Sequence, residues 1–143
     1  NVNLFLSNVI VLHYTKYLMP TDIKIAIVED DLPIAHMYKL KLESAGFQTV
    51  IAHDGKQGLE VIEKQLPQLI LLDLRMPVMS GDEMLEQMRQ TDWGCNIRVI
   101  VLTNISRDEA PRSLGLLNVD RYIVKAHHTP AQVLDIIIEL LGL

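Results

Sequence analysis

Five polar residues stand at the ends of short apolar runs, and their side chains suit the binding of a metal ion and an anion. They are Glu29, Asp30, Asp73, Thr103 and Lys125. Carboxylates gathered in one place repel one another unless a hard cation joins them, and oxygen ligands suit Mg²⁺, which keeps several waters. A lysine ammonium and a threonine hydroxyl opposite the acids can meet an incoming anion. Together these groups describe a site that attaches a phosphoryl group to Asp73 and neutralises it.

The apolar runs must position these residues, and the most informative run is Leu69–Leu72. Four large apolar residues bounded by turn signals are typical of a strand buried on both faces. We expect the other strands at 24–28, 47–52, 96–102 and 119–124. An acid directly after such a strand, as Asp73 is, also serves as a turn or capping residue. Because the other four polar residues also stand at the ends of apolar runs, we favour a functional site for Asp73 instead.

Helical patterns alternate with the five strands. We expect helices at 33–45, 57–65, 82–90, about 110–117 and 132–141, with Pro111 tolerated only in the first turn of the fourth. The predicted inner faces are Leu59, Ile62 and Leu66 in the second helix and Met84, Leu85 and Met88 in the third. Such alternation predicts a parallel sheet with helices on both faces, whose strands end at one common edge.

Composition narrows the class of protein. The chain has 143 residues, which favours one domain, and a formal charge of −5 without a basic cluster. Phosphate neutralisation requires clustered Lys and Arg, so direct nucleic-acid binding is not expected. The single cysteine, Cys95, excludes an internal disulfide and a cysteine-based zinc site.

Residues 1–20 do not match the rest of the chain. They are apolar without a clear period, and their uninterrupted apolar run, Val9–Leu12, is much shorter than the roughly 20 residues of a membrane span. No basic region precedes that run, which argues against a signal peptide. We interpret 1–20 as an extension outside the domain, with a truncated membrane anchor or amphipathic segment as the alternative. The domain is then 21–143, and we expect residues 1–18 to be dispensable.

Four short motifs follow one another in the domain: VEDD at 28–31, LLDLRMPVMSG at 71–81, VLT at 101–103 and YIVK at 122–125. Together they make the chain, from about Ile23 to Leu143, resemble the receiver domain of bacterial two-component response regulators. The resemblance implies an α/β flavodoxin-like fold, a doubly wound (βα)5 parallel sheet with strand order 2-1-3-4-5.

The resemblance also implies roles for single residues. Asp73 matches the phosphoacceptor, which attacks a phosphohistidine on a partner kinase. Asp30 matches a direct ligand of the Mg²⁺ cofactor and Glu29 a ligand acting mostly through water. The backbone carbonyl of Arg75 matches the group that completes the metal shell. These assignments make Mg²⁺ the expected cofactor.

Three further positions match residues that respond to phosphorylation. Thr103 matches the switch hydroxyl and Lys125 the phosphate-binding lysine. Tyr122 matches an aromatic residue that turns inward on activation, although its pattern also fits ordinary packing.

The chain departs from the family pattern after the fifth strand. The family usually has Lys-Pro there, with a cis peptide that aims the lysine, whereas this chain has Lys125-Ala126. A cis bond before alanine costs about 2.5–4 kcal/mol, so the loop must place Lys125 in another way. Asn104 stands where the family often has a smaller residue. His127 and His128 are interpreted as solvated loop residues.

The expected protein is a cytoplasmic, single-domain receiver, because no output domain follows Leu143 in this sequence. Its expected partners are a sensor histidine kinase or phosphotransfer protein and a downstream protein target, with a homodimer possible and no membrane contact. It is not expected to be an enzyme beyond Mg²⁺-dependent self-phosphorylation and dephosphorylation. A haloacid dehalogenase-type phosphohydrolase needs a second Asp two residues after the nucleophile, where this chain has Arg75. A degenerate, phosphorylation-independent interaction module is the remaining alternative.

Overall fold

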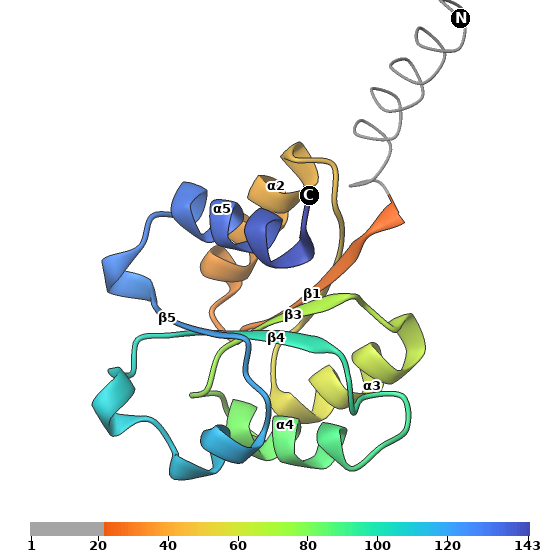
Figure 1. Cartoon of the computed structure of the whole chain (residues 1–143), viewed down its shortest axis with the longest axis vertical. Coiled ribbons are helices and arrows are strands. Elements are labelled where there is room, and N and C mark those ends of the chain that lie inside the picture. The colour runs from red at the N-terminus through yellow and green to blue at the C-terminus, as the bar shows by residue number, and fades with distance from the viewer. Residues whose placement is uncertain (1–21) are drawn as a thin grey trace, which may run out of the picture.

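The computed structural model describes residues 22–143, within which the chain forms one five-stranded parallel sheet between two layers of α-helices (Figure 1). The strands are β1 (Lys24–Val28), β2 (Gln48–Ala52), β3 (Leu69–Leu72), β4 (Arg98–Thr103) and β5 (Arg121–Val124). Their order is β2-β1-β3-β4-β5, and every neighbouring pair is parallel. This confirms the flavodoxin-like order 2-1-3-4-5 predicted from the sequence.

Each face of the sheet is covered by two α-helices. α2 (Leu32–Ser44) and α5 (Pro130–Leu141) cover one face, and α3 (Gly55–Gln65) and α4 (Gly81–Arg89) cover the other (Figure 1). Successive strand residues point to opposite faces, so Leu69 and Leu71 pack in the core under α2 and α5, while Ile70 and Leu72 pack in the core under α3 and α4. The four-residue apolar run is therefore required by burial on both sides.

The helix ends follow the chemistry of the sequence. Gly46 has φ 96° after α2, the left-handed conformation that glycine adopts most readily. Thr129 caps α5 by accepting a hydrogen bond from the amide of Gln132, and Pro130 begins the helix. Met84, Leu85 and Met88 are fully buried, as predicted for the inner face of α4.

Leu66 contradicts the predicted inner face of α3. It was assigned to the buried stripe with Leu59 and Ile62, but it caps the helix with φ 46° and is 54% exposed. Leu59 is partly buried and Ile62 fully buried, as expected. Pro67 follows Leu66 and disfavours helical geometry there, so the chain turns and carries the side chain outward.

The predicted helix at about 110–117 is wrong. The structure has two short 3₁₀ segments there, η2 (Arg107–Glu109) and η3 (Arg112–Leu116), separated by extended backbone. Ala110 lies at φ −63° and ψ 145°, which is the conformation that the following Pro111 imposes on its neighbour. Leu114 still packs in the core, so the segment is held by a few apolar anchors without an α-helix.

Arg89, the last residue of α4, binds the backbone that follows η3. Its guanidinium donates to the carbonyl oxygens of Leu117 at 2.8 Å and Asn118 at 3.1 Å, and to those of Gly94 at 3.0 Å and Ile97 at 2.7 Å. One side chain therefore connects α4 with the loops that lead into β4 and β5.

The predictions for residues 1–20 fall outside the described residues. Of the helices between 22 and 143, none combines the length and the apolar character that crossing a membrane requires.

Candidate functional site

The carboxylates of Glu29, Asp30 and Asp73 meet at the carboxyl edge of the sheet, after β1 and β3. Each offers an oxygen ligand, and these oxygens all lie within 4.8 Å of one another. The side chains of Glu29 and Asp73 are buried, whereas Asp30 is exposed. Among residues 22–143 this is the one group of acids, histidines and cysteines spaced to hold a metal ion. Its all-oxygen donor set fits a hard cation such as Mg²⁺.

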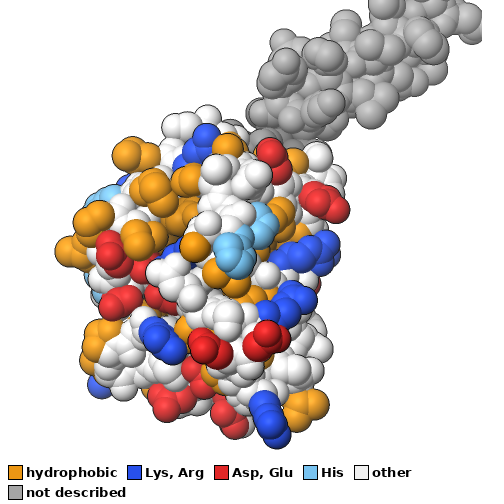
Figure 2. Space-filling model, turned by 90° about the vertical axis from the view of Figure 1, so that its left-hand side faces the viewer, with side chains coloured by type: hydrophobic (Ala, Val, Ile, Leu, Met, Phe, Trp, Pro, Cys, Tyr) orange, Lys and Arg blue, Asp and Glu red, His pale blue; other side chains and the backbone are white. Residues whose placement is uncertain are grey.

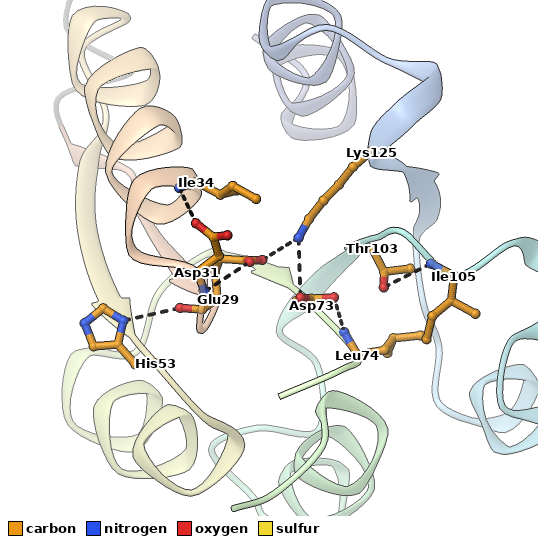
Figure 3. A network of polar contacts seen from close by, with 9 residues as sticks. All are labelled: Glu29, Asp31, Ile34, His53, Asp73, Leu74, Thr103, Ile105 and Lys125. Carbon is orange, nitrogen blue, oxygen red and sulfur yellow. Dashed lines mark hydrogen bonds and ion pairs between the residues drawn. The ribbon is translucent and has the colours of Figure 1, made fainter. Parts of the chain in front are cut away.

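Lys125 reaches across the sheet edge to two of these acids (Figure 3). Its Nζ lies 2.7 Å from Oε2 of Glu29 and 3.4 Å from Oδ2 of Asp73. Both acids are therefore ion-paired with Lys125, and Glu29 is the closer of the two. Three carboxylates face one ammonium, so the ionised site carries net negative charge that a cation can neutralise.

Burial changes the pKa of one carboxyl group of the site, that of Glu29. Removal of Glu29 from water raises the pKa of its carboxyl from the ordinary 4.5 to about 7, although the hydrogen bond from Lys125 opposes the rise. The charge of nearby Asp73 acts in the same direction as burial.

The backbone around Asp73 is fixed by close contacts. Its Oδ1 accepts a hydrogen bond from the amide of Leu74 at 2.8 Å, which orients the carboxylate. A Cβ atom at Gly81 would clash with the carbonyl oxygen of Asp73, so only glycine allows α4 to begin this close to the strand end. Gly81 therefore lets α4 begin directly against the backbone of Asp73.

Thr103 and Tyr122 meet at the loop that follows β4. The Thr103 hydroxyl accepts weakly from the amide of Ile105 at 3.5 Å, and the Tyr122 hydroxyl donates to the carbonyl of Ile105 at 2.8 Å. The guanidinium of Arg107 lies 5.7 Å from the centre of the Tyr122 ring. Thr103 and Tyr122 are therefore connected through Ile105. Thr103 also lines, with Asp73 and Lys125, a cavity of about 360 Å³.

The departures from the family pattern lie in the loops after β5 and β4. Every peptide bond between residues 22 and 143 is trans, including Lys125-Ala126. Lys125 begins a short 3₁₀ turn, η4 (Lys125–His127), and this turn directs its ammonium toward the acids. His127 is exposed, as interpreted from the sequence, but the interpretation of His128 as solvated is wrong, because it is partly buried and its Nδ1 is shielded from water. Neither histidine belongs to the acidic cluster. Asn104 is exposed and lines the same cavity as Asp73.

Arg75 lies beside the cluster with its side chain exposed, lining the cavity with Asp30. His53 was not predicted as part of the site. Its Nδ1 lies 3.3 Å from the backbone carbonyl oxygen of Glu29 (Figure 3). His53 directly follows the last residue of β2, so the rule that selected the other five residues could have selected it too.

A doubly wound parallel sheet with three carboxylates and a lysine at its carboxyl edge defines a receiver-type α/β domain. The model of the response regulator receiver domain family matches residues 25–137, and the chain belongs to that family.

Similar proteins include regulators and a phosphotransferase. The transcriptional regulatory protein CpxR of Escherichia coli K12 is 39% identical over 103 residues, covering 71% of this chain and 42% of CpxR. Sporulation initiation phosphotransferase F of Bacillus subtilis is 40% identical over 80 residues, covering 56% of this chain and 63% of that protein. The chain thus spans about two-fifths of CpxR.

Solved structures share the fold. The receiver domain of the sensor histidine kinase PA1611 from Pseudomonas aeruginosa PAO1 superimposes with a TM-score of 0.75 at 24% identity, over 84% of this chain and 98% of that one. That structure has a magnesium ion coordinated in its active-site cleft.

Proposed function

We propose that this receiver takes a phosphoryl group from the phosphohistidine of a sensor histidine kinase or a phosphotransfer protein onto Asp73. The observation that supports this most is the position of the Asp73 carboxylate. It lies between two further carboxylates and the ammonium of Lys125, which is 3.4 Å away, in a buried site at the sheet edge. Such a site favours charged ligands, because its carboxylates attract a cation and its ammonium attracts an anion.

The reaction is an exchange of one bond for another. An oxygen of Asp73 forms a bond to phosphorus while the bond between phosphorus and the donor's imidazole nitrogen breaks. The nitrogen leaves with that electron pair and takes up a proton. Lys125 neutralises negative charge on the transferred group, as charged donors do in phosphoryl-transfer sites.

Mg²⁺ would be held by Asp30, Asp73 and the backbone carbonyl of Arg75, with Glu29 mostly through water. When bound, it would supply charge neutralisation for the phosphoryl oxygens. The acidic cluster, with its oxygens within 4.8 Å of one another, supports this assignment. So does the magnesium ion in the cleft of the PA1611 receiver domain.

The output is proposed to be a change in protein contacts in the cytoplasm, without direct nucleic-acid binding and without catalysis beyond self-phosphorylation and dephosphorylation. Thr103 and Tyr122 would transmit the change, because both contact Ile105. A homodimer or a separate downstream protein would read it. The degenerate interaction module is less favoured, because the acidic pair, Thr103 and Lys125 are all present at the site.

Labelling by acetyl phosphate with and without Mg²⁺ tests the proposal. The protein should gain one phosphoryl group, detected as an intact mass increase, only when Mg²⁺ is present. Steady turnover of acetyl phosphate without a detectable adduct would favour a phosphohydrolase. The absence of both adduct and turnover would favour the degenerate module.

A further inference from the structure

Val78 has a backbone conformation that valine rarely adopts. Its φ is 69°, and the amide of Met79 donates to the carbonyl of Pro77 at 2.7 Å, which closes a three-residue γ-turn around Val78. For a β-branched residue a positive φ is strained, whereas glycine or asparagine adopts it at lower cost. The structure therefore holds valine where a different residue would be more stable.

Folding gains little from the Val78 side chain. It is 78% exposed and belongs to neither hydrophobic core of the described residues, although Met76 and Met79 on either side pack against one. The turn is nonetheless held firmly. The carbonyl of Met79 accepts from the amide of Gly55 at 3.0 Å, and the amide of Gly81 donates to Leu74 at 2.9 Å. Val78 is thus an exposed apolar side chain on a fixed backbone.

Val78 is exposed in the loop after Asp73, next to residues that line a cavity beside the site. Pro77 and Ser80, on either side of it, line with Asp30 a cavity of about 600 Å³. Leu32, which directly follows Asp31 and begins α2, is also apolar and is 52% exposed. Figure 2 shows the side of the molecule where the loops after β4 and β5 lie, with hydrophobic side chains above and below a group of acidic ones at the left. Exposed apolar side chains therefore lie close to acidic ones on this side of the molecule.

We infer that Val78 is a docking residue for the protein that carries the phosphohistidine, an inference that rests on the proposed function. Asp73 is only 7% exposed, so a histidine on a folded donor reaches it only when the donor's surface rests on the loops beside it. An apolar side chain on a rigid turn loses little conformational entropy on contact and gains from desolvation. A small molecule such as acetyl phosphate needs no such contact. The occupant of this surface is therefore a phosphohistidine protein whose surface beside the histidine is apolar.

The test compares protein and small-molecule donors on Val78→Asn. The protein probe is the autophosphorylated sensor kinase of the same genome that labels the wild-type chain fastest. Val78→Asn should melt a few degrees higher through release of strain, yet accept phosphoryl from that kinase at least ~10-fold more slowly, as for loss of an interface anchor. Labelling by acetyl phosphate should keep its rate. Val78→Ile, which keeps an apolar β-branched side chain, should keep the kinase rate.

Leu66→Asn is the matched control. Leu66 is also an exposed apolar residue at positive φ, but it precedes β3 at the opposite edge of the sheet. This variant should gain thermal stability and keep both rates. Equal kinase rates for wild type and Val78→Asn, or an equal loss in Leu66→Asn, would overturn the inference. The inference would also be overturned if acetyl phosphate labels the wild-type chain but no kinase labels it. Failure of labelling by every donor would instead overturn the proposed function itself.

Discussion

Lys125 is held more closely by Glu29 than by Asp73, with Nζ distances of 2.7 Å and 3.4 Å. The ammonium thus sits between the acid expected beside the metal and the acid expected to accept the phosphoryl group. Since Glu29 is buried, its charge depends on this one partner and on any cation that joins the cluster.

The stability of the metal-free protein should fall as pH rises through neutrality. Burial raises the pKa of Glu29 from 4.5 to about 7, so the folded state binds this proton more tightly than the unfolded chain. The resulting stabilisation is complete below about 4.5 and is lost as pH approaches and passes about 7. In urea titrations with EDTA, Glu29→Gln should lack this part of the pH dependence, and Glu86→Gln, an exposed control, should keep it. The same pH profile in wild type and Glu29→Gln would show that Glu29 does not titrate in this way.

Asp30 should contribute more to Mg²⁺ affinity than Glu29. Asp30 is exposed, whereas the Glu29 carboxylate is already paired with the ammonium of Lys125, which weakens its attraction for a cation. Titration calorimetry should find that Asp30→Asn lowers the affinity for Mg²⁺ by at least ~10-fold and that Glu29→Gln lowers it by less. Asp31→Asn is the control, because asparagine also caps α2 and the same formal charge is removed. Equal affinities in all four proteins would refute the metal site.

Thr103→Ala should accept a phosphoryl group but fail to move the loop after β4. In the structure the Thr103 hydroxyl has only a 3.5 Å contact with the amide of Ile105, so it is available to a new acceptor on Asp73. A shift of the loop would disturb the 2.8 Å bond from Tyr122 to Ile105, with a coupling of about 1–3 kcal/mol. NMR spectra with and without beryllofluoride should show changes around Tyr122 in wild type and Thr103→Ser, and not in Thr103→Ala. Identical changes in all three would exclude a hydroxyl-coupled switch.

Arg89→Met should destabilise the fold by about 2–4 kcal/mol, because four carbonyl oxygens lose a charged donor. Arg98→Met is the matched control. Its ion pair with Asp120 is 3.9 Å long and half exposed, and the expected loss is below about 1 kcal/mol. Urea denaturation measures both. Equal losses would mean that the Arg89 contacts contribute no more than a surface pair.

The sheet could be predicted from the sequence because burial on two faces leaves little freedom in residue type. Leu69–Leu72 pairs with β1 and β4 on its two sides and faces a core on each surface, so each of its residues must be apolar. The meeting of Asp73 with Lys125 at one edge follows from parallel strands alone.

Features that depend on local backbone competition or on side-chain reach could not be predicted in the same way. The apolar spacing of 110–117 favours a helix, but Pro111 prevents helical geometry at Ala110, and the few buried side chains do not compensate. Lys125 lies closer to Glu29 than to Asp73 by less than an ångström, and residue types do not encode so small a difference in distance.

Chemical mapping of the phosphoryl group tests the central claim most directly. After labelling with acetyl phosphate and Mg²⁺, borohydride reduction and peptide mass mapping should find a single modified residue, Asp73. Asp73→Asn should stay folded and take up no label, while Asp92→Asn, at an exposed acid outside the cluster, should label like wild type. Labelling of Asp73→Asn at the wild-type rate, or modification mapped to another residue of the wild-type chain, would contradict the account.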